Sequence, residues 1–319
     1  MNFTKLSMIP KMAIPVTMKK IDAAVFVFWS IRYAWPLEII PTSAIMALKR
    51  ENCDMGWMAD ETGLDKCTAN YVPLTPLSHL QRAATVFSEQ TAVVYGSHRA
   101  TYQQYHARVT KLASGLASIG VMPGDVVATL LPNTTAQIEA SFGVPACGAV
   151  INTINTRLDV GTISYIFDHG EAKVVMVDTQ FLSSVEAALT TMDGPAPQII
   201  EVADPEAGYA ASGRHPEYEE FLDQGNAGYT WVMPSDEWES LALNYTSGTT
   251  GRPKGVVYHH RGAYLNAVSN ILAWNMQAHP TYLWTLPLFH CNGWCFPWTI
   301  AALNGTNICL RAVRADHIF

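Results

Sequence analysis

Charged residues are scarce in this sequence of 319 residues, and the basic ones are outnumbered by the acidic ones. Asp, Glu, Lys and Arg make up 15% of the chain, with 20 Lys and Arg against 27 Asp and Glu and a formal net charge of -7. Because no basic excess is present to bind a nucleic-acid backbone, we predict no nucleic-acid partner. The hydrophobic content of 49% excludes a disordered chain.

The sequence also has no C-x-x-C pair, no internal repeat and no apolar run long enough to cross a membrane. Its most apolar stretch, residues 23–31, is much shorter than the roughly 20 residues that a transmembrane helix needs. We therefore predict no stable membrane span. Six cysteines are spread along a chain large enough to fold without disulfides, which favours reduced thiols and a cytoplasmic location.

Residues 1–57 differ in composition and hydrophobic pattern from the rest of the chain. They contain six of the twelve methionines and show no clean hydrophobic period. The apolar stretch at 23–31 could be the core of a signal peptide, but Asp22 and Arg32 flank it closely. A targeting segment stays open as an alternative. We favour a leader that is not part of a domain, or upstream sequence translated from a start codon placed too early, with Met58 opening the folded protein.

From about residue 71 onward, short β-rich runs alternate with helical stretches, which is typical of βαβ units and a mainly parallel sheet. The predicted strands are 92–95, 126–130, 173–177, 198–202, 241–245, 282–286 and 307–310. The predicted helices are 101–119, 134–147, 160–169, 182–191 and 262–276. We therefore predict an α/β fold of layered, parallel-rich sheets with flanking helices.

The most informative stretch is Tyr-Thr-Ser-Gly-Thr-Thr-Gly-Arg-Pro-Lys-Gly at 245–255, at the end of a predicted strand. Glycines let backbone amides crowd around an anion, hydroxyl groups add donors, and a lysine supplies a compact positive charge. The stretch is not a Walker A motif, because Pro253 stands where that motif needs glycine and Gly255 follows Lys254. A flexible linker is the alternative, but the position between a strand and a following helix favours a phosphate-binding loop.

This loop resembles the nucleotide-phosphate loop of the adenylate-forming (AMP-binding) superfamily, which contains acyl-CoA synthetases, firefly luciferases and peptide-synthetase adenylation domains. Weaker similarities follow in the family's order within residues 71–319: ATYQQY at 100–105, MPGD at 122–125, LPNT at 131–134 and PACGAVINTINTRL at 145–158. The sequence LWTLPLFHCNGWCFPW at 283–298 is similar to the acyl-CoA ligase branch that includes plant acyl-activating enzymes and methylmercaptopropionate-CoA ligases.

The resemblance implies that residues 58–319 are a partial AMP-binding (adenylation) domain, the N-terminal part of the large domain of such an enzyme. The small C-terminal domain is expected to be absent from this chain. The implied reaction is the ATP-dependent activation of a fatty or aromatic carboxylic acid to an acyl-adenylate and then to an acyl-CoA, with coenzyme A as co-substrate and Mg²⁺ sharing the phosphate charge.

The resemblance also implies site residues. For the ATP phosphates these are Thr246, Ser247, Gly248, Thr249, Thr250, Gly251 and Lys254. His290 is the implied catalytic residue, since an imidazole there can donate to an oxygen that gains charge; a histidine of the core is the alternative. The implied lining of the acyl and coenzyme A channels is Phe289, Asn292, Gly293 and Trp294. Cys291 and Cys295 lack a second pair of ligands, so we predict no metal site built from protein side chains.

Two functions of different class stay open. The chain is an acyl-CoA ligase, or the N-terminal portion of one, or it is a catalytically inactive truncated homologue that acts as a binding or scaffold protein. The HCNGW sequence at 290–294 disfavours a luciferase or a peptide-synthetase domain. The resemblance implies a small carboxylic acid as the bound molecule, and a peroxisomal rather than cytoplasmic location if the protein is a plant homologue.

Overall fold

The computed structural model describes residues 65–246 and 252–318. The chain divides into two compact units, Met1–Asn70 and Tyr71–Phe319. Within the first unit, residues 65–70 are described, and there the Asn70 side chain accepts a hydrogen bond from the Cys67 amide at 2.9 Å. The interpretation of residues 1–57 and of Met58 lies outside the described residues. The described helices and sheets belong to the second unit.

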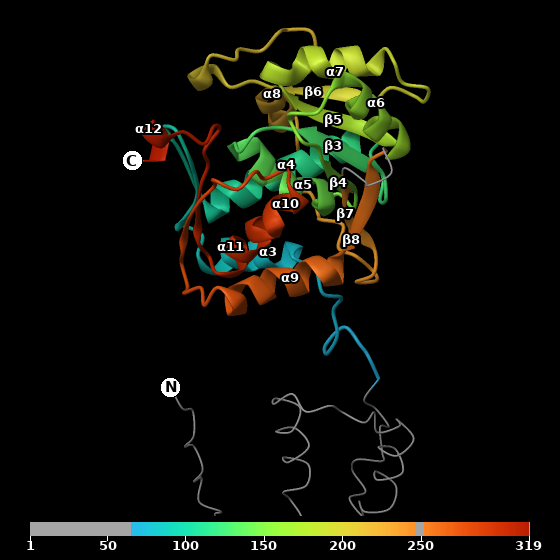
Figure 1. The fold of residues 1–319 in the computed structure, drawn as a ribbon. Helices are drawn as coiled ribbons and strands as arrows, with labels where there is room; N and C mark the ends of the chain where they lie inside the picture. The colour runs from blue at the N-terminus through green and yellow to red at the C-terminus, as the bar shows by residue number, and fades with distance from the viewer. Residues whose placement is uncertain (1–64, 247–251, 319) are drawn as a thin grey trace, which may run out of the picture. The chain divides into compact units, whose positions relative to one another are not determined.

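Two β-sheets form the frame of the second unit (Figure 1). The larger sheet has the order β6-β5-β3-β4-β7-β8, with β3 Val126–Leu130, β4 Val150–Thr153, β5 Ala172–Asp178, β6 Gln198–Val202, β7 Ser240–Thr246 and β8 Lys254–His259. Its strands pair in parallel except β8, which is antiparallel to β7. The smaller sheet has the order β2-β1-β10-β9, with β1 Thr91–Tyr95, β2 His98–Thr101, β9 Thr281–Leu283 and β10 Thr306–Ile308.

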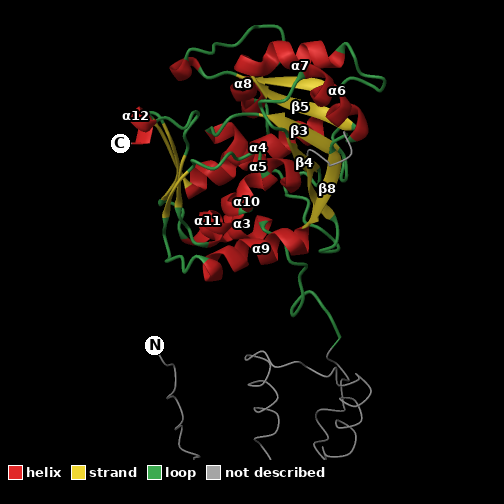
Figure 2. Ribbon diagram, viewed as in Figure 1, coloured by secondary structure: helices red, strands yellow, loops and turns green. Residues whose placement is uncertain are grey.

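The helices cover both faces of the larger sheet (Figure 2). The helices on its inner face, toward the smaller sheet, are α3 Leu77–Val86, α4 Tyr102–Ser118, α5 Thr135–Ala146, α9 His260–Ala273 and α11 Phe296–Ala302. The outer face is covered by α6 Val160–His169 and α7 Leu182–Leu189. Short elements are the 3₁₀ turns Thr179–Phe181 and Pro205–Ala207 and the helices α8 Tyr218–Asp223, α10 Cys291–Trp294 and α12 Ala315–Ile318.

The alternation of side chains along β5 shows how the sequence builds these layers. Val174 and Met176 are buried in the inner core, whereas Val175 and Val177 are buried in the outer one. Because both faces of a parallel sheet are covered, its strands are apolar at nearly every position. α5 is buried at every residue from 136 to 146, which places this helix in the centre of the inner core. No helix among the described residues combines the length and apolarity needed to cross a membrane.

The predicted fold class is confirmed, and each of the predicted strands and helices is present within a few residues of its predicted bounds. The predicted order of strand, loop and helix around residues 245–255 was wrong, because strand β8 lies between the loop and α9. The first four residues of β8 are exposed, so no buried apolar run marks this edge strand in the sequence. The elements β2, β4, α3, α8, α10, α11 and α12 were also not predicted.

Candidate active site

The antiparallel pair β7 and β8 holds the two ends of the glycine- and hydroxyl-rich sequence. Thr246 is the last residue of β7 and lies opposite Lys254, the first residue of β8. The intervening candidates Ser247, Gly248, Thr249, Thr250 and Gly251 lie outside the described residues. The Tyr165 hydroxyl of α6 donates to the Pro253 carbonyl oxygen at 3.2 Å. The hairpin therefore brings a hydroxyl and an ammonium side chain together at the two ends of the loop.

A cavity of about 340 Å³ opens beside this hairpin, and we call it the hairpin cavity. It lies at the ends of β4 and β7 and against β8. Among the residues implied by the family resemblance, Thr246, Phe289 and His290 line it. α/β proteins bind their ligands at the carboxyl ends of parallel strands, and the hairpin cavity has this position.

The wall of the hairpin cavity between β4 and β7 is polar and buried. The Thr153 hydroxyl lies 2.8 Å from the Phe289 carbonyl oxygen and 3.0 Å from Asn244 Oδ1, and its single proton is donated to one of them at a time. Asn244 is 5% exposed, and its Nδ2 has no partner among the described protein atoms. Leaving a buried amide without an acceptor costs free energy, so the cavity favours an occupant that accepts a hydrogen bond there.

Asn133 fastens the segment that carries Phe289 and His290. Its Nδ2 donates to the carbonyl oxygens of Trp284 and Leu286, both at 2.9 Å, and its Oδ1 accepts from the Leu288 amide at 2.8 Å. Asn133 itself lies in the connection between β3 and α5 and is 7% exposed. One buried side chain thus joins the end of β3 to the residues that lead into the cavity.

The backbone after His290 is strained. His290 is exposed, and its Nδ1 lies 3.9 Å from Cys291 Sγ. Each of the five residues 291–295 has φ between +50° and +63°. A left-handed conformation costs roughly 1–2 kcal/mol at each residue other than glycine, so the surrounding packing must hold this turn in place. Strain of this kind gathers at functional sites.

The two residues in the middle of this turn are buried and border neither the hairpin cavity nor the cavity that Trp294 lines. Asn292 is 1% exposed, and neither of its side-chain polar atoms has a partner among the described residues. At Gly293 a Cβ atom would lie 2.7 Å from the ring of Trp284. Gly293 therefore allows a close approach to Trp284 that no other residue could make without displacement.

Trp294 lines a cavity of about 460 Å³, which we call the Trp294 cavity. Val256 faces the hairpin cavity and Val257 faces the Trp294 cavity. Since successive residues of a strand face opposite sides, β8 separates the two. Tyr258 and Cys291 border both. The implied channel residues are thus divided. Phe289 lines the hairpin cavity and Trp294 lines the Trp294 cavity, whereas Asn292 and Gly293 are buried and line neither.

Two tyrosines of the site stay protonated at neutral pH. Burial, with a smaller effect from neighbouring Tyr165, raises the pKa of Tyr245 to about 12. Its hydroxyl forms a hydrogen bond with His169 Nδ1 at 2.8 Å. Burial and the Cys291 thiol raise the pKa of Tyr258 as well. Both phenols are therefore available as neutral hydrogen-bond donors.

Metal-binding potential is small in the part of the chain that the structure describes. There, no group of three or more His, Cys, Asp and Glu side chains is placed to hold a metal ion. Cys67, Cys147, Cys291, Cys295 and Cys309 are free thiols.

Sequence reasoning assigned no role to Asn133, Thr153, Asn244 and Tyr258. The first two lie in stretches that were noted only for their family similarity, and Asn244 precedes the loop directly. The sequence held a signal for these three residues, because polar residues at the carboxyl ends of parallel strands gather at one edge of the sheet. Tyr258 had no such signal, since β8 was not predicted.

A sequence rich in glycine and hydroxyl residues that follows β7 at the carboxyl edge of a parallel sheet, with a histidine on the adjoining cavity, is typical of α/β proteins that bind phosphate groups. The comparison with known families is more specific. The chain belongs to the AMP-binding enzyme family, whose profile matches residues 80–318.

Relatives and solved structures agree with this assignment. A peroxisomal acetate/butyrate–CoA ligase (AAE7) of Arabidopsis thaliana is 48% identical over 271 residues, which are 82% of this chain and 48% of that protein. A peroxisomal trans-cinnamate:CoA ligase of Petunia hybrida is 43% identical and covers 80% of this chain and 47% of its own length. The chain thus spans about half the length of these relatives.

The fold is that of solved CoA ligases. The inhibitor-bound N-terminal domain of FACL13 from Mycobacterium tuberculosis superimposes with a TM-score of 0.67 at 27% identity, covering 77% of this chain and 59% of that one. A long-chain-fatty-acid-CoA ligase (FadD1) from Archaeoglobus fulgidus gives a TM-score of 0.69 at 20% identity, covering 77% and 49%.

Proposed function

We propose that this protein takes part in the ATP-dependent conversion of a small carboxylic acid to its acyl-CoA, as the N-terminal portion of an AMP-forming acid–thiol ligase. The proposal rests above all on one observation: Thr246 and His290 line the same cavity, and Lys254 lies opposite Thr246. Relatives that are named as CoA ligases support it.

The roles follow from charge. Thr246 and Lys254, with Ser247, Gly248, Thr249, Thr250 and Gly251 between them, would bind the β- and γ-phosphates of ATP and the departing pyrophosphate. The ammonium of Lys254 offsets phosphate charge, and the hydroxyls and glycine amides donate hydrogen bonds. We propose that Mg²⁺ enters with the phosphates, in keeping with the lack of a three-ligand cluster among the described residues.

His290 would act on the oxygen that gains negative charge when the carboxylate attacks the α-phosphate. It is exposed at the wall of the hairpin cavity, so its ring nitrogens can reach a bound molecule. Asn244 could donate a hydrogen bond to the same oxygen, because its Nδ2 has no partner among the described protein atoms and lies at this wall. Asn133 and Thr153 would hold the segment of Phe289 and His290 in place.

The substrate and the location are proposed from the relatives. Their names give acetate and butyrate in one case and trans-cinnamate in the other, so we propose a short or aromatic carboxylic acid. Phe289 in the hairpin cavity and Trp294 in the neighbouring one would contact the acid and coenzyme A. Both relatives are named as peroxisomal, and we propose a peroxisomal or cytoplasmic location.

The test compares nucleotide binding in two lysine variants by calorimetry. Lys254→Met removes the ammonium but keeps the apolar stem, and a charge-assisted contact is worth about 1.5–3 kcal/mol, so ATP affinity is expected to fall at least about tenfold. AMP, which lacks the β- and γ-phosphates, should bind equally to wild type and variant. Lys111→Met is the matched control, because Lys111 of α4 pairs with Asp223 of α8 and does not line the cavity. Unchanged ATP affinity in Lys254→Met would contradict the loop assignment.

Pyrophosphate exchange with acetate, butyrate and cinnamate separates the two functions left open by the sequence. Exchange with any of the acids supports the ligase. ATP binding without exchange would favour a binding protein that retains the nucleotide site.

A further inference from the structure

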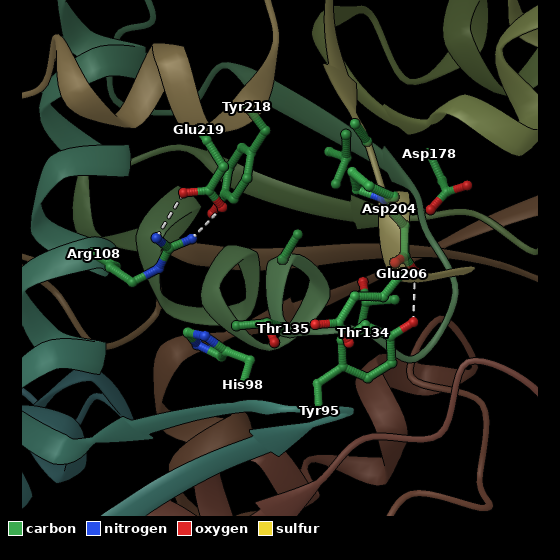
Figure 3. A pocket seen from close by; sticks show the side chains of 14 residues that line it. Tyr95, His98, Arg108, Thr134, Thr135, Asp178, Asp204, Glu206, Tyr218 and Glu219 are labelled. Carbon is green, nitrogen blue, oxygen red and sulfur yellow. Dashed lines mark hydrogen bonds and ion pairs between the residues drawn. The ribbon is translucent and has the colours of Figure 1, made fainter. Parts of the chain in front are cut away.

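A cavity of about 270 Å³ lies at the ends of β5 and β6 and at the N-terminus of α5, and we call it the α5 cavity. It shares no lining residue with the hairpin cavity or the Trp294 cavity. In Figure 3, Thr134 and Thr135 lie between the Arg108–Glu219 pair on one side and Asp178, Asp204 and Glu206 on the other. The proposed ligase reaction uses none of these residues.

The N-terminus of α5 supplies hydrogen-bond donors to this cavity. Thr134 is the N-cap residue of a helix of 12 residues, yet its side chain caps no amide. It is 5% exposed, and its Oγ1 and that of Thr135 have no partner among the described protein groups. The first amides of any α-helix lack intrahelical acceptors, and the helix dipole adds partial positive charge at this end. Together these groups fit a carboxylate or another anion.

The other walls carry an excess of negative charge. Among the described residues, the charged side chains that line this cavity and their ion-pair partners are Asp178, Asp204, Glu206, Glu139, Glu219, Arg108 and Arg311. Arg311 pairs with two of the carboxylates, at 2.6 and 2.7 Å, and Arg108 pairs with two others. Five carboxylates against two guanidinium groups leave a net charge of about -3 at neutral pH. A free anion is therefore disfavoured, although one end of the cavity is built to bind one.

We propose that the α5 cavity binds a small zwitterion of the amino-acid type. Its carboxylate would accept hydrogen bonds from Thr134, Thr135 and the first amides of α5, and its ammonium group would face the carboxylates of Asp204 and Glu206. A zwitterion can bind the hydrogen-bond donors of α5 with its carboxylate and the acidic walls with its ammonium group at the same time. An anion or a cation can bind only one of these two ends of the cavity. The volume of about 270 Å³ accommodates a molecule of amino-acid size.

Calorimetry with compounds that carry one or both charges tests this proposal. The zwitterions are glycine, β-alanine and γ-aminobutyrate, and propionate and propylamine are the single-charge counterparts of β-alanine. We expect at least one zwitterion to bind, and to bind at least about tenfold tighter than its single-charge counterparts. Thr134→Val is expected to weaken that binding about tenfold, because it removes the hydroxyl without changing the shape of the side chain.

Thr129→Val is the matched control. Thr129 in β3 is equally buried, its hydroxyl also lacks a partner among the described residues, and it borders none of the three cavities. Neither Thr129→Val nor Lys254→Met should change zwitterion binding, and Thr134→Val should leave ATP binding unchanged, so this proposal and the ligase proposal fail independently. The proposal is overturned if no zwitterion binds, if Thr134→Val binds as wild type does, if Lys254→Met abolishes binding, or if propionate binds as tightly as β-alanine.

Discussion

Asn133 is the residue whose replacement tests most directly how the structure holds the His290 segment. Its side chain makes three hydrogen bonds, to the Trp284 and Leu286 carbonyl oxygens and to the Leu288 amide. Trp284 is 0% and Leu288 is 1% exposed. In Asn133→Ala, the backbone groups of these two residues would lose their partners in the core, whereas Leu286 is only partly buried.

The expected loss of stability follows from two buried backbone groups, the Trp284 carbonyl oxygen and the Leu288 amide. A buried donor or acceptor that loses its partner costs about 1–3 kcal/mol, so Asn133→Ala should lower the free energy of unfolding by about 2–6 kcal/mol. That is a large part of the roughly 5–15 kcal/mol that stabilises a typical domain. Asn226→Ala is the matched control: its Oδ1 accepts one hydrogen bond, from the Gly228 amide, at an exposed position, so a loss below about 1 kcal/mol is expected.

Asn133→Asp gives a sharper test, because it keeps an acceptor for the Leu288 amide but directs a carboxylate oxygen at two carbonyl oxygens. Repulsion raises the pKa of the introduced carboxyl group in the folded state. The folded variant then binds its proton more tightly than the unfolded one, so its deficit relative to wild type should shrink as the pH falls through that raised pKa.

Urea unfolding followed by tryptophan fluorescence measures these free energies, and hydrogen exchange reports the protection of the Leu288 amide. Protection at Leu288 should be lost in Asn133→Ala and kept in Asn226→Ala. The reasoning fails if Asn133→Ala stays within 1 kcal/mol of wild type, or if the Leu288 amide is equally protected in both.

Three further predictions concern stability and domain limits. Burial lowers the pKa of His79 and of His260 from 6.5 to about 4. Between pH 6.5 and pH 4 the folded state therefore binds fewer protons than the unfolded state. The free energy of unfolding should fall by about 3 kcal/mol per histidine as the pH is lowered through this range, and His79→Gln and His260→Gln should each reduce that fall. Gly293→Ala should cost at least about 2 kcal/mol in urea unfolding, because its Cβ would lie 2.7 Å from a buried tryptophan ring at a φ of +57°. Limited proteolysis with mass analysis should remove residues 1–57 and leave a core starting near Met58; a protected core reaching well into those residues would contradict that boundary.

Sequence patterns predicted the elements whose burial is continuous. The predicted strand 126–130 coincides with β3 and the predicted helix 160–169 with α6, because each buries a regular set of apolar side chains. The same logic missed β8, whose first four residues are exposed, since an edge strand is stabilised by backbone pairing with β7 rather than by a buried run. That one missing strand made the predicted loop-to-helix order wrong.

The sequence by itself determined the class of fold and the chemistry of the loop, because the periods of helix and strand and the residue types at 245–255 are properties of neighbouring residues. Only the tertiary structure decided that Thr246 and His290 border one cavity, that Trp294 faces another across β8, and that Asn133 holds the segment between them. Such contacts join segments far apart in the chain. They depend on the order of strands in the sheet and on the side to which each residue points. For an exposed edge strand or a left-handed turn, local sequence patterns do not specify the strand order or the direction of the side chains.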